Sequence, residues 1–472
     1  MKKKYDKIAM LVVIMIVFAL LSWLIEGGMY NTGEFVSVGK VRAGLYDLLL
    51  VVYSAFYYRA KDILFIFIVG GCYGVLSQTK SYRKLVDNIS KIIKGKEILA
   101  FGVVLALTAM YTSVTNEIFA LFCFAPLVVS IFLRNGYDRI TAISAGFGGM
   151  FVGYLGQVVG TFGLSYLNEA TGLGVTDWII AKVILLVAAY VLFFIFAALH
   201  MKKVKKVDET KYDLFLPEVL EDKKEKSKRR PKGIATIIVF ILSFIIIGIA
   251  YISWNESFGT QFFTEMHTSF TSLFKVKDVA IPSAIVGPYM TGFGEWNDLL
   301  GASFVFIIAT IILALIDKMN MNSFMKYFGK GSKRISKVAF IYGFAFIMLF
   351  LCSSYPWPTT LIDKLLNGDS FNIIIVLLAS FLAHLFTGEP GYCGYAFGSY
   401  LAVAYVDNII PMTILWRLGA ALALIIAPTS YVLLAALTYA DIPYTKWLKY
   451  IWKFVLSFIL VALIVMAVVC YM

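Results

Sequence analysis

Long apolar runs are the feature that most constrains the fold of this chain. The sequence has 472 residues, 60% of them hydrophobic, and its mean hydropathy is +0.82. Several windows of about 18 or more residues carry almost no charge, which is the length that crosses a bilayer as one helix. Backbone N–H and C=O groups find no water in hydrocarbon, so such segments must be helical. We therefore expect an all-α polytopic membrane protein with the lipid bilayer as its surroundings.

The net charge of +13 is concentrated in short segments beside the apolar runs. This distribution follows the positive-inside rule, so it reports topology and indicates no nucleic-acid partner. It predicts a multi-pass protein of the cell (cytoplasmic) membrane, with the N-terminus and the loop 201–232 in the cytoplasm. The lysine-rich start before residues 8–24 imitates a signal peptide but lacks a small-residue cleavage site, so we expect an uncleaved helix. The basic clusters are residues 2–7, 80–96, 202–232, 318–337 and 446–453.

The apolar runs predict about nine full spans and two further segments with polar centres. The two segments are 97–134 and 371–405. If 371–405 crossed the membrane once, the lysines at 446–453 would fall outside, against the charge rule. We therefore expect 371–405 to be a re-entrant hairpin. The expected spans are 8–25, 62–78, 140–162, 177–200, 234–254, 299–317, 336–354, 412–436 and 450–471.

The order of features in the two halves predicts an inverted repeat. In both halves a segment with a polar centre is followed by a turn with an Asp and then by a span rich in small residues. This parallel makes 97–134 a second hairpin. We expect a first repeat at 1–200, a cytoplasmic basic linker at 201–232, a connecting helix and outer-face loop at 233–298, and a second repeat at 299–472. Inverted repeats are typical of secondary transporters, whose sites lie near mid-membrane.

Each hairpin has a polar tip with one acid, Glu117 in the first and Glu389 in the second. A charged side chain near the bilayer centre costs roughly 2.5–3.5 kcal/mol, so it is usually kept for a task. The glutamates could accept a sodium ion, a proton or a substrate ammonium, and broken helix ends bind ions of either sign. The alternative is that both acids lie in interfacial water and only cap helices.

The predicted substrate and ion site combines the two tips with two interrupted spans. The glycine-rich span ends at Gly156-Gln157, and Pro428 should break the other span. For the glycines alone, close helix packing is the favoured interpretation. The candidate residues are Thr112, Ser113, Thr115, Asn116, Glu117, Gly156, Gln157, Thr387, Gly388, Glu389, Pro428, Thr429 and Ser430.

For two further side chains, Arg417 and His384, a functional role and a structural role are both possible. Arg417 is a candidate counter-charge for a substrate carboxylate or for Glu389, although we favour a side chain that reaches the outer headgroups. His384 could move protons, but a packing histidine is favoured. Glycines 70–74 should allow close approach of helices. Five cysteines without a CxxC pair and three scattered histidines predict no disulfide framework, no metal site and no resident cofactor.

Enzyme signatures are scarce in the sequence. It has no GxSxG, HExxH or Walker loop, so we do not expect an enzyme. A membrane-embedded glycan transferase or polymerase is a distant alternative. A channel is disfavoured because no pore-lining repeat of one charge sign is present.

Several motifs resemble those of the DcuC/YfcC-type carriers of the ion-transporter superfamily. They are residues 62–76, residues 135–141, and the C-terminal elements Ala427-Pro-Thr-Ser-Tyr431 and Ile442-Pro-Tyr-Thr-Lys-Trp447. The resemblance implies a fold of inverted repeats with two hairpins, a homodimer and an elevator-type movement. It implies substrates that are C4-dicarboxylates or, in one branch, amino acids. At the first tip, Thr112 to Glu117 stand where relatives often have an acidic pair.

The two acids favour an amino acid over a dicarboxylate as the substrate. A dianion beside Glu117 and Glu389 would be repelled unless a cation or proton intervened. We therefore expect a secondary active transporter of a small charged metabolite, most naturally a basic amino acid such as arginine or ornithine. Transport would occur by exchange or by coupling to a cation, with Na⁺ or H⁺ both open. The alternative is a C4-dicarboxylate carrier for succinate or fumarate.

Overall fold

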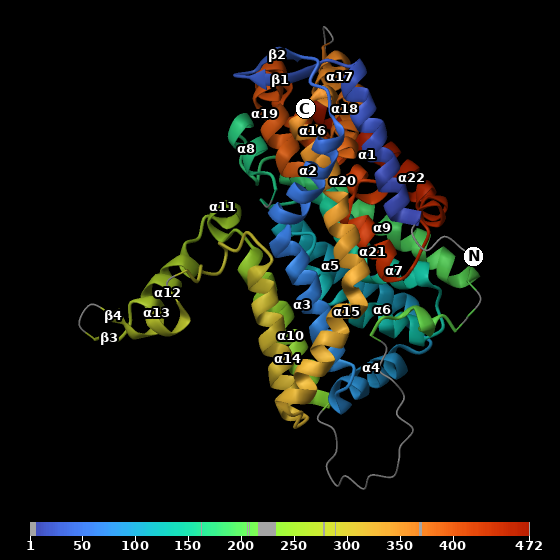
Figure 1. Ribbon diagram of the computed structural model, residues 1–472, viewed down its shortest axis with the longest axis vertical. Helices are drawn as coiled ribbons and strands as arrows, with labels where there is room; N and C mark the ends of the chain where they lie inside the picture. Colours follow the sequence, from blue (N-terminus) through green and yellow to red (C-terminus); the bar gives the residue numbers. More distant parts are fainter. Residues whose placement is uncertain are drawn as a thin grey trace.

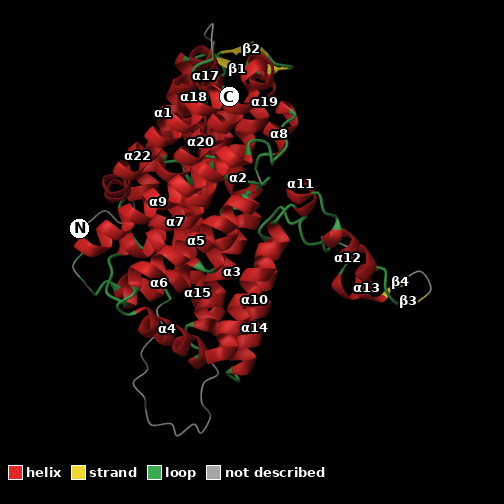
Figure 2. Cartoon of the chain, turned by 180° about the vertical axis from the view of Figure 1, so that it is seen from behind, coloured by secondary structure: helices red, strands yellow, loops and turns green. Residues whose placement is uncertain are grey.

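The computed structural model is almost entirely helical (Figures 1 and 2). It describes residues 6–161, 163–204, 206, 208–215, 233–276, 279–287, 289–367 and 371–471. Most of the expected basic linker, residues 216–232, lies outside the described residues, as do the first five lysine-rich residues. The strands form two small antiparallel hairpins, β1 (Gly27–Asn31) with β2 (Glu34–Gly39) and β3 (Lys275–Val276) with β4 (Val279–Ala280).

The helical content confirms the expected all-α polytopic membrane class. Among the described residues, seven helices are long and apolar enough to cross a membrane, or eight if a bent pair counts as one span. The nine expected spans are not all recovered by this measure. Leu300–Ile316 falls just short of span length, and the helix in the expected span 140–162 is not among those that pass. The arm Glu97–Thr115, which no expected full span covers, does pass.

Both halves of the chain consist mainly of helices, several of them short and interrupted. The first half contains α1 (Asp6–Leu24), α2 (Leu45–Tyr58), α3 (Ala60–Leu76), α4 (Lys80–Ile93), α5 (Glu97–Thr115), η1 (Ala120–Cys123), α6 (Ala125–Arg134), α7 (Arg139–Gly156), α8 (Ser165–Thr171) and α9 (Ile179–Lys203). The second contains α14 (Leu300–Ile316), α15 (Met321–Ala345), α16 (Ile347–Ser354), α17 (Trp357–Leu366), α18 (Ile373–Thr387), α19 (Pro390–Ala404), η3 (Val406–Asn408), α20 (Ile409–Ile426), α21 (Tyr431–Tyr439) and α22 (Tyr444–Tyr471). The inverted-repeat relation itself stays a prediction.

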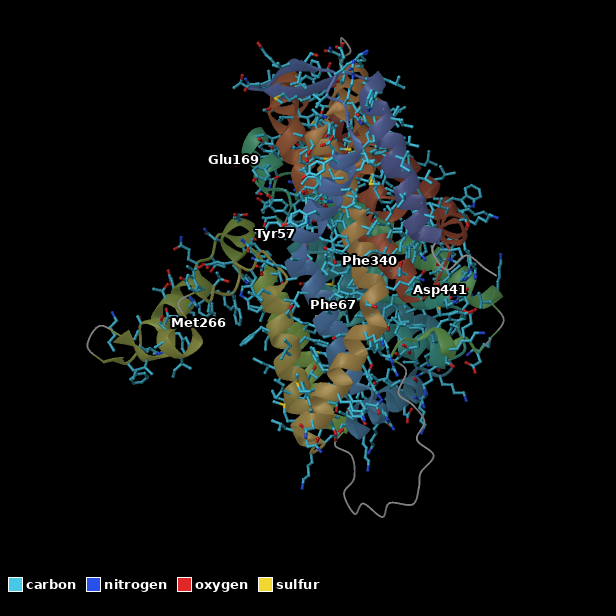
Figure 3. The ribbon with its side chains drawn as sticks, in the orientation of Figure 1. Tyr57, Phe67, Glu169, Met266, Phe340 and Asp441 are labelled. Atoms are coloured by element: carbon cyan, nitrogen blue, oxygen red, sulfur yellow. The ribbon has the colours of Figure 1, made fainter. Side chains whose placement is uncertain are left out.

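Helices α3 and α15 run in opposite directions and pack closely where both carry glycines. A Cβ on Gly74 would lie 2.4 Å from the carbonyl oxygen of Tyr327, and one on Gly331 would lie 2.1 Å from that of Gly70. Backbones can approach this closely only where side chains are absent. The expectation that the glycines at 70–74 allow close helix approach is therefore confirmed. Figure 3 labels Phe67 and Phe340 on these two helices.

Both polar-centred segments leave the protein core at the edge where they enter it. Near the start of α5, Glu97 pairs with Lys206 at 3.0 Å, and at the end of α6, Arg134 pairs with Asp87 of α4. These residues line one shared cavity or adjoin it. In the other segment the rings of Phe371 and Tyr405, which flank α18 and α19, lie 5.7 Å apart. Each segment therefore has the geometry of a hairpin.

One helix was not expected from the sequence. Residues 45–58, which no expected span covers, form α2, and its axis continues into α3 after a break at Arg59, whose N–H bonds to the Ala55 carbonyl. The charges of Asp47, Arg59 and Lys61 had masked this apolar run. The stretch 281–297, expected as an outer-face loop or partial helix, agrees with that expectation, since it begins with the short helix α13 (Ile281–Val286).

An arm projects from the helical body beyond the connecting helix α10 (Gly233–Tyr251) (Figure 1). The arm comprises α11 (Trp254–Phe258), α12 (Phe262–Thr271), β3, β4 and α13. Met266, labelled in Figure 3, lies on it. The short 3-10 helix η2 (Thr210–Tyr212) belongs to the described part of the linker.

Candidate functional site

The first tip forms because α5 stops at a polar sequence. Thr115 ends the helix, and Asn116 takes a left-handed conformation with φ +58, which Asn adopts more readily than most residues. The hydroxyl of Thr115 accepts from the Glu117 N–H at 3.1 Å. The backbone thus turns sharply and presents Glu117 beyond the helix end.

Glu117 is held by one of its two oxygens. Its Oε1 accepts from the N–H groups of Phe119 at 2.8 Å and Ala120 at 3.1 Å. Its side chain is only 3% exposed, and its Oε2 has no hydrogen-bond partner among the described residues. Glu117 therefore caps backbone N–H groups, but its burial contradicts the part of the alternative that places it in interfacial water.

Gln157 is the second buried polar group with unmet hydrogen bonds. It ends α7 with φ +41 and is 2% exposed. Neither its Oε1 nor its Nε2 has a hydrogen-bond partner among the described residues, and the same holds for Thr112 Oγ1. Leaving a buried polar group unmet costs about 1–3 kcal/mol. Groups of this kind call for an explanation such as a bound ion, water or ligand.

The first tip packs on the break in the span that follows it. The N–H of Val159 donates to the Ser113 carbonyl at 3.2 Å. A Cβ on Gly160 would lie 2.4 Å from the Asn116 nitrogen, so the break approaches the tip backbone closely. The tip residues and the break that follows Gln157 therefore belong to one local structure.

The second tip is built in the same way. Gly388 ends α18 with φ +71, and Glu389 caps α19 by accepting from the Tyr392 N–H at 2.6 Å. The Thr387 hydroxyl donates to the Ala383 carbonyl at 3.0 Å. Glu389 is half-buried, so for this acid the capping alternative is met at least in part.

The second tip also packs on a helix break. Helix α20 ends before Pro428, and Thr429 Oγ1 donates to the Leu385 carbonyl of α18 at 2.6 Å. A Cβ on Gly388 would lie 2.8 Å from the Thr429 carbonyl oxygen. Ser430 caps α21 by accepting from the Leu433 N–H at 3.2 Å.

Tyrosines connect the two tip-and-break units. The Tyr342 ring of α15 lies 4.9 Å from Phe119, next to the first tip, and 5.3 Å from Tyr431, just after the second break. The hydroxyl of Tyr154 on α7 is close enough to the charged groups of Glu389 and Arg417 to interact with them electrostatically. The candidate residues of the two halves therefore converge on one central region.

Arg59 and Asp62, at the break between α2 and α3, are site residues that the sequence analysis missed. They form an ion pair at 3.6 Å, and Asp62 accepts from the Tyr342 hydroxyl at 3.2 Å. Arg59 lies within electrostatic range of Glu389, and Asp62 within that of Glu117. The sequence carried one usable signal, an Arg and an Asp three residues apart inside an apolar run.

Arg417 does not reach the headgroups, because its side chain is 5% exposed. One guanidinium nitrogen donates to Asn168, while Nε and Nη1 have no hydrogen-bond partner among the described residues. The favoured expectation of an arginine at the surface is therefore wrong.

His384 is buried in the hairpin arm α18. Its Nδ1 lies 2.7 Å from the Ser380 carbonyl oxygen of the same helix, which is the arrangement of a packing histidine.

A cavity of about 740 Å³ adjoins the first break and the arm. Ser257 of α11 bonds to the Val159 carbonyl at 2.7 Å, so the arm holds the break region. The cavity wall includes two acids and several aromatic residues. The lining residues include Thr161, Tyr251, Trp254, Glu256, Glu295 and Trp296. Tyr251, which lines the cavity, donates through its hydroxyl to the Asp298 carbonyl at 2.6 Å.

The fold and the central site define a polytopic membrane transporter. No group of three or more His, Cys, Asp and Glu residues suited to a metal ion is present in the described part of the chain. The family model for the C4-dicarboxylate anaerobic carriers (DcuC) matches residues 5–471. The chain therefore belongs to this family of carriers, in agreement with the resemblance of its motifs.

Curated relatives match over most of the chain at low identity. An uncharacterized protein of Haemophilus influenzae is 22% identical over 455 residues, which are 92% of this chain and 80% of the relative. An Escherichia coli protein named "Putative basic amino acid antiporter YfcC" is 19% identical over 437 residues, which are 89% of this chain and 80% of the relative.

A solved structure also aligns, though its similarity is low. Neisseria gonorrhoeae MtrF, described as illuminating a class of antimetabolite efflux pumps, covers 98% of this chain and 94% of its own. The TM-score is 0.39 and the identity 10%. A similarity of this size carries no argument about the site.

Proposed function

We propose that the protein is a secondary active transporter of an amino acid, most naturally a basic one such as arginine or ornithine. The observation that carries the proposal is the charge of the central region. Three acids, Glu117, Glu389 and Asp62, stand against two arginines, Arg59 and Arg417. If these five groups are all ionised, and Lys182 beside Arg417 is balanced by Asp177, the net charge is −1, which complements a substrate of charge +1 and repels a dianion.

The polar groups left open in the site suit the two ends of an amino acid. Glu117 Oε2 and the amide of Gln157 can accept from an ammonium or guanidinium group. The N-terminus of α21, capped by Ser430, and the open nitrogens of Arg417 can bind a carboxylate. The curated relative in Escherichia coli, named for basic amino acids, supports the same class.

The mode of transport is part of the proposal. Exchange, or coupling to Na⁺ or H⁺, would supply the driving force, and a homodimer with an elevator-type movement would carry the site across. We place the protein in the cell membrane, with the N-terminus and the loop 201–232 in the cytoplasm. The basic clusters support this orientation through the positive-inside rule.

C4-dicarboxylate transport is the second candidate, and the family model favours it. Arg59 and Arg417 could each hold one carboxylate of succinate or fumarate. Protonation or a bound cation would then have to neutralise Glu117.

Counterflow in proteoliposomes separates the two candidates. Vesicles preloaded with unlabelled solute should accumulate labelled arginine, ornithine or lysine unmodified. Accumulation of succinate or fumarate with no response to the basic amino acids would overturn the choice of substrate. A chemically altered product would instead point to the distant alternative of a glycan transferase.

A further inference from the structure

A cavity of about 490 Å³ lies far from the central site, at the base of the first hairpin. Its wall is formed by α4, by the end of α6 and the turn after it, and by Lys206 beyond α9. The lining residues are Asp87, Ser90, Lys91, Lys94, Arg134, Asn135, Gly136 and Lys206. Four cations thus face one acid.

The acids near this cavity are already engaged. Asp87 pairs with Arg134, and Glu97 pairs with Lys206 at 3.0 Å. Lys91 and Lys94 are exposed and have no ion-pair partner among the described residues. The free charge of the cavity is therefore positive, which selects an anionic ligand.

Ser90 gives an independent sign of a ligand. Its side chain is 8% exposed, it lines the cavity, and its Oγ has no hydrogen-bond partner in the described ranges. A buried hydroxyl without a partner costs free energy. A phosphate oxygen at this place would accept the hydroxyl proton, while the lysines balance the charge.

The surroundings point to a lipid as the source of the phosphate. Helix α4 turns by 90° from α3, and its basic and apolar faces are those of a helix that lies in the membrane interface. Ile92 and Leu99, next to the cavity in sequence, are 74% and 64% exposed. Such side chains would contact acyl chains beside the headgroup.

We propose that this cavity binds the phosphate of an anionic phospholipid headgroup. Ser90, Lys91 and Lys94 hold the phosphate, and Arg134 and Lys206 close the wall from the hairpin base and from beyond α9. Basic pockets beside membrane helices on the cytoplasmic side take lipid headgroups in this way. The proposal does not depend on which solute the central site carries.

The test compares charge-matched double variants of the full chain in lipid vesicles. Lys91→Gln with Lys94→Gln removes the open cations, and Lys326→Gln with Lys330→Gln removes two exposed lysines of α15 that do not line the cavity. Thermal unfolding is followed as phosphatidylglycerol replaces phosphatidylcholine. Because a ligand of the folded state stabilises it, the titration yields an apparent affinity.

We expect the cavity variant to bind phosphatidylglycerol about fivefold more weakly for each lysine removed, which corresponds to about 1 kcal/mol per lysine. The α15 variant should behave like the wild type. Ser90→Ala, which keeps both lysines, should give a smaller loss in a folded protein. The proposal is overturned if the cavity variant keeps the lipid response, or if both double variants lose it equally. It is also overturned if inorganic phosphate at matched ionic strength reproduces the whole gain in phosphatidylcholine.

Discussion

At the scale of single residues, burial distinguishes the two tip acids. Glu389 is half-buried and caps α19, as an acid at a helix N-terminus often does. Glu117 is buried and uses one oxygen for two backbone N–H groups, which leaves Oε2 open. A buried acid with an open oxygen is suited to bind a cation that arrives from solution.

Glu117→Gln should abolish transport without loss of folded protein. The amide oxygen can still accept from Phe119 and Ala120, so the tip keeps its shape, but the charge is gone. Losing one partner of a buried ion pair costs about 3–5 kcal/mol, so uptake should fall at least about a hundredfold. Uptake by the variant in proteoliposomes measures this, with Glu265→Gln on the arm as the control. Near-normal uptake would return Glu117 to a capping role.

The linker should respond to pH through Asp213. Burial raises the pKa of Asp213 to about 6, while contacts with Ser130, the Phe215 N–H and Tyr439 work in the opposite direction. The folded state therefore holds the proton more tightly than the unfolded chain. The protonated Asp213 side chain stabilises the docked linker segment 208–215 against its unfolded form. This stabilisation is fully present below the unfolded pKa of about 3.9 and is lost as pH rises through the folded pKa of about 6; the loss is at most about 3 kcal/mol.

Hydrogen exchange of residues 208–215 measures this effect. After correction for intrinsic rates, we expect stronger protection at about pH 5 than at about pH 8. Asp213→Asn should remove the difference, whereas Asp208→Asn, at an exposed position of the same segment, should leave it unchanged. Equal protection at both pH values in the wild type would contradict the prediction.

At the scale of elements, the recurring unit is a hairpin tip packed on a helix break. The first unit joins α5 to α7 through Ser113 and Val159, and the second joins α18 to α20 through Leu385 and Thr429. Irregular backbone is tolerated at membrane depth when it is buried in protein or lines a cavity. Each helix break therefore covers the irregular backbone of a hairpin tip from lipid, and the tip covers the backbone of the break in the same way.

Gly388→Ala should loosen the second unit. The added Cβ would lie 2.8 Å from the Thr429 carbonyl oxygen, and the left-handed φ of +71 is strained for alanine. Together these effects should lower the free energy of unfolding by about 1–3 kcal/mol. Gly329→Ala is the matched control, because a Cβ there meets nothing within 4 Å in a helix, and it should gain up to about 1 kcal/mol. Chemical unfolding in detergent compares the two; an unchanged Gly388 variant would speak against tight tip packing.

At the scale of the whole molecule, the antiparallel pair α3 and α15 connects the two halves of the chain. The bases of the two hairpins lie at different edges of the helical body. The base of the first lies beside α4 and Lys206. The base of the second lies near the β1–β2 hairpin, where Tyr30 stacks on Tyr400 at 4.4 Å. Under the proposed function, the two edges would be the two sides from which the site is reached in turn.

Cysteine labelling can test the orientation in the membrane. In a Cys470→Ser background, where the remaining cysteines are buried, Ser37→Cys on β2 should react with an impermeant maleimide in intact cells. Lys330→Cys should react only after the membrane is opened, because the positive-inside rule places it in the cytoplasm. The reverse labelling pattern would invert the topology.

Much of the architecture was predictable because apolar length and charge placement act locally. The membrane class, most of the apolar helices and the glycine contacts of α3 follow from runs of sequence that each element carries by itself. That the two polar-centred segments are re-entrant in the membrane stays a prediction. Helix α2 was missed because Asp47 and Arg59 interrupt its apolar run, although Arg59 finds its partner in Asp62.

The sequence by itself determined that this protein lies in a lipid bilayer. Its long uncharged runs are of membrane-spanning length, and in hydrocarbon their backbone N–H and C=O groups find hydrogen-bond partners only within a helix. It also predicted where a site should lie, because acids in such runs are costly unless used. Only the tertiary structure decided which side chains meet. It brought Arg59 and Asp62 of the α2–α3 break to Tyr342 and buried Arg417. These outcomes depend on contacts between residues far apart in the chain, and no local pattern encodes them.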